Sequence, residues 1–238
     1  MGNNYSVSGT SSRHLAEESA RFMSGVYKWM TFGVLTTAIV SYSFSENTDL
    51  MSFIIQNRFV FWLLIIAQLG SVFFLSAMIK KISAFAATMI YLLYSALTGT
   101  TLSVIFLTYT QASIQSAFFV TSFSFAGLSA FGYLSKRDLG PIGTFCHMGL
   151  WGLIGFGVLT LFFPSMMSGT ASTVYSLCGI LVFAGLAAYD TQKIKNMNVW
   201  GREGSDDAQK GTIYGALTLY LDFINLFLSI LRLTGKRR

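Results

Sequence analysis

Long apolar stretches alternate with short polar connections along most of the chain. A helix needs about 20 apolar residues to cross a hydrocarbon core about 30 Å thick. Lipid offers backbone N–H and C=O groups no partner, so only helices or closed barrels that satisfy their own backbone can span it. The pattern predicts an all-α membrane protein built as a bundle of seven transmembrane helices, over residues 26–44, 59–79, 82–109, 113–134, 143–163, 173–192 and 212–233.

The composition agrees with this class. Hydrophobic residues make up 53% of the chain and charged residues 11%, whereas roughly 25% of a soluble domain is charged. The connections are too short for a separate soluble domain, which predicts a single membrane domain over residues 26–238. Residues 1–25 are rich in Ser, Gly and Asn, so we expect a disordered cytoplasmic tail there. No cleavable signal segment precedes the first span, and we expect that span to be retained.

The formal net charge is +6, and the basic residues border the apolar stretches. That placement is typical of topology signals, so we expect no nucleic acid partner. Because cytoplasmic connections are enriched in Lys and Arg, the N-terminus and the second, fourth and sixth connections are predicted to be cytoplasmic. The basic residues behind this prediction are Arg13, Arg21, Lys28, Lys80, Lys81, Lys136, Arg137, Lys193, Lys195, Arg202 and Lys210.

The C-terminal tail departs from the charge pattern. Arg232, Lys236, Arg237 and Arg238 would be external if the last segment crosses the membrane completely. Two interpretations therefore stay open. Either seven full crossings tolerate a basic external tail, or the last segment turns back within the membrane.

Two aspartates, Asp190 and Asp222, are the only acidic residues within or at the rim of the apolar stretches. An ionised carboxylate at the centre of a membrane helix costs at least ~2.5–3.5 kcal/mol, so such residues are usually paired, protonated or in contact with water. They are the candidate functional residues. A purely structural role, such as capping a neighbouring helix or fixing helix packing, is the alternative.

The last apolar stretch carries four polar residues on one helical face, namely Thr218, Asp222, Asn225 and Ser229. Lipid would leave the polar groups of such a stripe without partners. The stripe therefore predicts that the last helix lies in the centre of the bundle. Asp222 is expected near mid-bilayer and Asp190 near the cytoplasmic end of its span. Counting ~1.5 Å per residue places the two aspartates ~13 Å apart in depth.

Cysteine and histidine residues give weaker signals. Cys146 and Cys178 both lie inside apolar stretches, which makes a disulfide framework unexpected. His147 adjoins Cys146, but two potential ligands fall short of the four that a structural zinc site uses. We therefore expect no resident cofactor.

The run from Tyr189 to Lys195, Tyr-Asp-Thr-Gln-Lys-Ile-Lys, and the later run from Leu219 to Phe227, Leu-Tyr-Leu-Asp-Phe-Ile-Asn-Leu-Phe, resemble the signature of the Bax inhibitor motif family, most closely its bacterial branch. The resemblance implies a seven-helix bundle with the last helix in the middle. It also implies that Asp190 and Asp222 form a pH-sensing pair associated with calcium leak across the bacterial inner (plasma) membrane.

The resemblance further implies a latch on the sixth-span aspartate. Bacterial relatives place a basic residue at the cytoplasmic end of the second span, where it can bind that aspartate and hold the path shut. The corresponding residue here is Lys81, with Lys80 adjacent, where an arginine would be expected. Lysine lacks the planar fork of arginine, so a lysine latch would be geometrically weaker. Both lysines could equally be ordinary positive-inside anchors.

Two carboxyl groups in contact share a proton, and their doubly ionised form attracts a cation or Lys81. Ca²⁺ binds six to eight oxygens, for which Asn225, Thr218 and backbone carbonyls could supplement the aspartates weakly. The prediction is thus a pH-sensitive leak for calcium or another cation. One alternative is a non-conducting regulator that binds and restrains another membrane protein, such as a quality-control protease.

An intramembrane aspartyl protease is a remote alternative, since such enzymes also share a proton between two aspartates. Leu-Tyr-Leu precedes Asp222, where those proteases have Gly-x-Gly, and no Pro-Ala-Leu motif follows. We therefore expect a protein that is not an enzyme.

Overall fold

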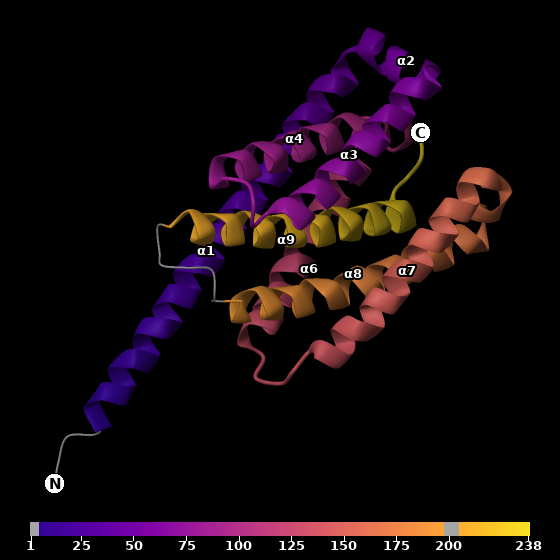
Figure 1. The fold of residues 1–238 in the computed structure, drawn as a ribbon. Helices are drawn as coiled ribbons and strands as arrows, with labels where there is room; N and C mark the ends of the chain where they lie inside the picture. The colour runs from indigo at the N-terminus through magenta and orange to yellow at the C-terminus, as the bar shows by residue number, and fades with distance from the viewer. Residues whose placement is uncertain (1–4, 198–204) are drawn as a thin grey trace.

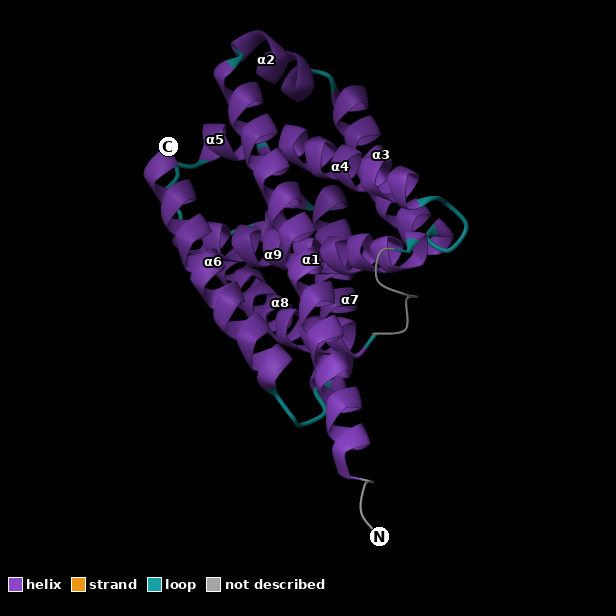
Figure 2. Cartoon of the chain, turned by 90° about the vertical axis from the view of Figure 1, so that its left-hand side faces the viewer, coloured by secondary structure: helices purple, strands orange, loops and turns teal. Residues whose placement is uncertain are grey.

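The computed structural model describes residues 5–197 and 205–238, which are helical nearly throughout (Figures 1 and 2). The prediction of an all-helical chain is confirmed for these residues. The elements are α1 (Tyr5–Glu46), α2 (Thr48–Gln56), α3 (Arg58–Met78), α4 (Ala84–Leu102), α5 (Ile105–Thr108), α6 (Gln111–Leu134), α7 (Gly140–Phe162), the 3₁₀ turn η1 (Pro164–Met167), α8 (Thr170–Asn196) and α9 (Asp206–Thr234).

Six segments of the described chain are long and apolar enough to cross a membrane, so the predicted seven is not confirmed. They are α3, the unit of α4 and α5, α6, α7, α8 and α9. The predicted first span lies inside α1 but is not among them. It carries Lys28 and several hydroxyl side chains. Two of these, on Thr31 and Thr36, bond carbonyls of the same helix four residues back.

The N-terminal stretch differs from the disordered tail expected over residues 1–25, because α1 is already helical from Tyr5. Ser, Gly and Asn prompted that expectation, but the stretch also holds good helix formers, including Leu15 and Ala16. Glu17 and Arg21, one turn apart, form an ion pair with a 3.8 Å separation between Oε2 and Nη2. Helix formation therefore continues upstream of the apolar part of α1.

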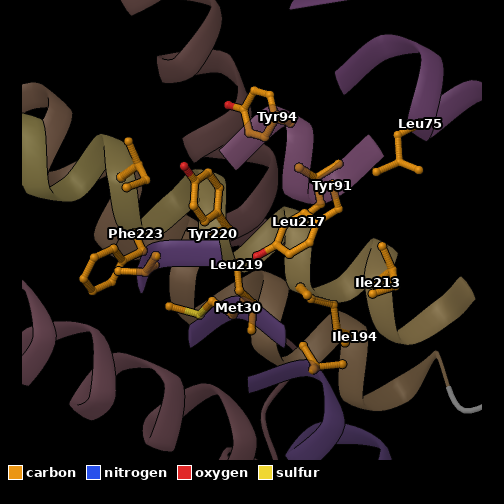
Figure 3. Packing of buried hydrophobic residues seen from close by; sticks show 14 of the residues in the cluster. Met30, Leu75, Tyr91, Tyr94, Ile194, Ile213, Leu217, Leu219, Tyr220 and Phe223 are labelled. Carbon is orange, nitrogen blue, oxygen red and sulfur yellow. The ribbon is translucent and has the colours of Figure 1, made fainter. Parts of the chain in front are cut away.

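The last helix lies in the middle of the bundle, as its polar stripe predicts. α9 packs against α1, α4, α6 and α8, and it lies between α4 on one side and the α7–α8 pair on the other (Figure 1). Its side chains form much of the hydrophobic core. Leu217, Leu219 and Tyr220 of α9 pack there with Met30 and Tyr91 (Figure 3).

The C-terminal tail pairs with the chain that leads into α6. The N–H of Thr110 donates to the carbonyl of Lys236 at 3.1 Å, and the N–H of Arg238 donates to the carbonyl of Thr108 at 3.0 Å. This contact lies at the opposite end of α6 from the connection that holds Lys136 and Arg137. α9 also continues unbroken to Thr234. The last segment therefore runs the length of the bundle, which favours the interpretation in which it crosses completely.

Candidate functional site

The two aspartates come from α8 and α9, whose mutual register is set by close contacts at two glycines. A Cβ atom on Gly215 would lie 3.0 Å from Cγ2 of Ile194, and one on Gly179 would lie 2.5 Å from Oγ of Ser229. Counting from either contact, Asp190 and Asp222 differ in level by only about one helical turn, or ~5 Å. The ~13 Å separation predicted from span ends is wrong, because α9 begins well beyond the end of α8.

The carboxyl groups of Asp190 and Asp222 lie within hydrogen-bonding reach of each other. Both residues are buried, at 6% and 5% exposure. Oδ2 of Asp222 has no hydrogen-bond partner among the described residues. Two ionised carboxylates can only accept hydrogen bonds, so a hydrogen bond between them requires one proton. The geometry therefore suits a pair that holds a single shared proton.

The carboxyl pair faces a cavity of about 500 Å³. Residues of α9 line this cavity from Tyr214 to Arg232, which corresponds to about 27 Å of helix rise, close to the hydrocarbon thickness of a bilayer. α3, α7 and α8 supply the other walls. The pair thus lies partway along an elongated space within the bundle.

The predicted polar stripe lies along this same cavity. Thr218, Asp222, Asn225 and Ser229 all line it. The hydroxyls of Thr218 and Ser229 donate to carbonyls of α9 at 3.0 and 2.8 Å, and the Asn225 amide donates to the carbonyl of Leu221 at 2.8 Å. Because these groups donate within their own helix, their side-chain oxygens remain as acceptors along the cavity wall.

Two charged or titratable groups act on the Asp190 carboxyl besides its partner, namely Lys193 and His147. His147 lines the cavity from α7, and its Nδ1 lies 2.8 Å from the carbonyl of Gly143. Its ring meets that of Tyr189 edge-on at 5.9 Å. Sequence reasoning weighed His147 only as a metal ligand, and its spacing from the aspartates gave no signal of this proximity.

A second residue that sequence reasoning did not assign to the site is Arg232. It lines the cavity near the C-terminal end of α9, and its guanidinium lies 5.0 Å from the centroid of the Tyr175 ring. Sequence reasoning counted Arg232 only as a charge of the C-terminal tail. The polar stripe could have signalled its position, because Arg232 follows Ser229 by three residues.

The structure does not bring the predicted latch to the pair. Lys80 and Lys81 are exposed in the turn between α3 and α4. Neither is among the groups that act on Asp190. Of the other basic residues predicted to be cytoplasmic, Arg202 lies outside the described residues. The contact of Lys81 with Asp190 stays a prediction, and it would require a different arrangement of the chain from the one in this structure.

The residues that follow Asp190 fasten α8 to the connection between α6 and α7. Oε1 of Gln192 accepts from the N–H of Leu139 at 2.9 Å, and its Nε2 donates to the carbonyl of Arg137 at 2.8 Å. Lys195 donates to the carbonyl of Tyr133 at 2.7 Å. These side chains satisfy backbone groups at a helix end and so fix the position of the Asp190 segment.

The described residues contain no cluster of three or more His, Cys, Asp or Glu side chains that could hold a metal ion. Cys146 and Cys178 are free thiols. The carboxyl pair offers four oxygens, with Asn225 nearby on the same wall. Such a set falls short of the six to eight oxygens of a tight Ca²⁺ site, so it suits a cation in passage better than a stored one.

Comparison with known proteins places the chain among membrane proteins. The model of the family described as inhibitor of apoptosis-promoting Bax1 matches residues 19–238. Inner membrane protein YbhL of Escherichia coli is 47% identical over 218 residues, which cover 91% of this chain and 92% of that protein. An uncharacterized protein of Borreliella burgdorferi is 41% identical, with 92% and 93% covered. The similarity extends far beyond the two motifs in the last helices.

Proposed function

Since the chain belongs to the family of inhibitors of apoptosis-promoting Bax1 and is an integral membrane protein, we propose that it is a pH-sensitive leak channel for calcium or another cation. The observation that carries the proposal is the contact between the Asp190 and Asp222 carboxyls inside an elongated cavity. We propose the inner membrane of a bacterial cell as its location, because the relative from Escherichia coli is an inner membrane protein.

The proton shared by the pair is the switch in this proposal. With one proton the pair carries a single negative charge, and a hydrogen bond holds α8 against α9. Loss of that proton leaves two like charges in contact, which repel each other and attract a cation. Lys193 is the nearby cationic side chain that would offset the added charge.

Passage of the cation would follow the polar stripe. Oxygens of Thr218, Asn225 and Ser229 line the cavity on both sides of Asp222, and Asp222 is the one carboxylate on that helical face. Apolar residues such as Leu221 and Leu228 line the cavity beside them. Few ligands and an apolar surround give weak binding, and a conducting site must release its ion as readily as it takes it up.

We propose that the protein conducts without catalysing a reaction. The carboxyl contact would also serve an aspartyl protease, which activates water between two such groups. The sequence around Asp222 lacks the motif of those enzymes, and the cavity is lined mostly by apolar side chains that leave little space for a peptide. Incubation of the purified protein with a transmembrane peptide substrate tests this part of the proposal, and cleavage that requires Asp222 would overturn it.

The experiment that tests the leak is a flux measurement in proteoliposomes. The protein is reconstituted with a Ca²⁺ indicator inside the vesicles, and uptake is followed from about pH 5 to 8. We expect uptake that changes severalfold across this range, and parallel measurements with Na⁺ and K⁺ would identify the preferred ion. Uptake equal to that of protein-free vesicles at every pH would contradict the proposal.

We also propose that the N-terminus is cytoplasmic, because the basic connections gather on the side of Lys136 and Arg137. Single cysteines placed at the C-terminus and in the connection at 135–139 of a cysteine-free variant test this orientation. We expect only the C-terminal cysteine to react with an impermeant reagent added to intact cells. The opposite labelling pattern would reverse the orientation.

A further inference from the structure

A groove of about 1080 Å³ runs between α1 and α6, on a different side of the bundle from the aspartate cavity. On α6 its wall is formed by residues three or four positions apart, namely Ser122, Phe125, Ala126, Ser129, Ala130 and Tyr133. That spacing presents a single helical face. The small members of this set, two serines and two alanines, leave the space that the groove occupies.

The floor of the groove is built from aromatic side chains. Phe223 of α9 packs edge-on against Phe125 at 5.5 Å and against Phe118 at 5.8 Å. Among the described residues, α1 and α6 each pack against α9 but hardly against each other. The groove is therefore a gap between two helices that both pack on α9, and it opens sideways, toward the surface that lipid surrounds.

Two lysines lie on or beside the groove. Lys28 of α1 lines it directly, and Tyr133 of α6 carries Lys195 over its ring at 4.5 Å from the centroid. Val26 and Ile194 both pack at Gly215, where a Cβ atom would lie within 3.1 Å of each. Lys28 lies two residues beyond Val26 on α1, and Lys195 lies one residue beyond Ile194 on the antiparallel α8, so the two lysines differ in level by about one helical turn, or ~5 Å. From that level the apolar wall of α6 continues to Phe118.

We propose that this groove binds one anionic phospholipid, with its phosphate at Lys28 and one acyl chain along α6. The wall from Tyr133 to Phe118 spans about 22 Å, enough to hold a chain that crosses one leaflet of about 15 Å. Two cations at the level of the headgroup match a lipid with a net negative charge. The hydroxyls of Ser122 and Ser129 leave the wall mainly apolar, as an acyl chain requires.

A transmembrane helix from a second copy is the competing occupant. A second helix, apolar enough to cross the membrane, does not account for Lys28 on the groove wall or for Lys195 over the Tyr133 ring. A flexible chain follows the narrow space between α1 and α6 without either helix having to move.

Native mass spectrometry of the full chain, released from detergent with defined lipids, tests the proposal. The probes are phosphatidylglycerol, which is anionic, and phosphatidylcholine, which is zwitterionic. We expect the wild-type protein to retain one phosphatidylglycerol in preference to phosphatidylcholine. Lys28→Gln should reduce that preference by about fivefold, the size expected for one lysine beside an anionic lipid surface. Lys28→Arg should keep it, and Lys136→Gln, a change in an exposed connection, should leave it unaltered.

A second variant fills the groove without touching charge. Ala126→Leu should reduce retention of both lipids, whereas Ala38→Leu, at an exposed position of α1 outside the groove, should not. Circular dichroism and gel filtration check that each variant is folded. Equal retention of the two lipids by the wild-type protein, or equal losses in Lys28→Gln and Lys136→Gln, would overturn the proposal. So would a dimer mass that Ala126→Leu abolishes, because the groove would then hold a second copy.

Discussion

The polar residues on the two faces of α9 differ in how fully they are hydrogen-bonded. On the face toward α1 and α4, the Tyr220 hydroxyl lies 2.6 Å from Oγ1 of Thr37, which in turn lies 2.8 Å from the carbonyl of Ser95. The Tyr220 ring also meets those of Tyr91 and Tyr94 edge-on, at 5.9 and 5.6 Å (Figure 3). Asp222 follows two residues later on the other face, and its Oδ2 lacks a partner among the described residues.

This difference separates a polar cluster that holds the fold together from one that is able to change state. On the tyrosine face the hydroxyls of Tyr220 and Tyr91 have partners and the rings pack edge-on, so a change would cost contacts without gaining any. On the cavity face the carboxyls meet each other, there is room beside them, and the interaction depends on one proton. The tyrosine face therefore holds α9 in place, while the carboxyl pair on its cavity face is able to change its protonation state.

Removal of the carboxyl contact should have the largest effect. Asp190→Asn and Asp222→Asn should each remove most of the pH dependence of Ca²⁺ flux, because either change ends the like-charge repulsion. The double variant should add little, as expected for two residues that act as one unit. The measurement is flux from about pH 5 to 8 for all four proteins, each checked by gel filtration. Independent, additive effects would mean that the aspartates do not work as a pair.

Glycine substitutions on the two sides should differ in stability. A Cβ atom on Gly33 would lie 2.0 Å from the Tyr91 hydroxyl, so Gly33→Ala should lower the free energy of unfolding by about 1–3 kcal/mol through overpacking. On the cavity side, a Cβ atom on Gly157 would lie 3.5 Å from the Tyr175 hydroxyl, an ordinary contact. Gly157→Ala should therefore be nearly neutral or slightly stabilising. Denaturation in detergent compares the two, and equal losses would remove the distinction between the faces.

Loss of the Tyr220 hydroxyl should have a smaller effect. Tyr220→Phe leaves Thr37 without that partner, at a cost of about 0.6–1.7 kcal/mol for an interhelical hydrogen bond in a membrane protein. The pH dependence of flux should be retained, because the tyrosine face does not contact the carboxyl pair. A flux profile that flattened as it does in Asp222→Asn would show that the tyrosine face takes part in the switch.

Charge removal at Lys81 and Lys193 should have the smallest effects. Lys81 is exposed and is not among the groups that act on Asp190, so Lys81→Gln should change resting flux by about twofold or less, as for an exposed charge. Lys193 acts on Asp190 from one turn away, and Lys193→Gln should shift the flux profile more. A large rise in resting flux in Lys81→Gln alone would restore the latch.

The sequence predicted the helical class, the approximate spans and the polar stripe, because membrane burial leaves a direct mark on local composition. The sequence did not predict which residues of different helices lie at the same level, because this depends on how the helices are offset along their axes. The contacts of Gly215 with Ile194 and of Gly179 with Ser229 bring the aspartates together, and neither contact can be read from spacing along the chain. His147 was missed for the same reason, since α7 brings it to the pair from more than forty residues away.

The length of α1 has a mechanical consequence. Its 42 residues extend over about 63 Å, about twice the hydrocarbon thickness. Among the residues whose burial is described, buried positions of α1 begin at Ser19, so the segment before it, about a third of the helix or ~21 Å, extends from the bundle toward the N-terminus (Figure 1). The rest packs along α4 and α9. A rigid rod held at one end magnifies rotation at the other. A tilt of about 10° over the projecting ~21 Å moves the tip by about 4 Å, so a spin label near the N-terminus would report small rearrangements of the bundle as measurable displacements.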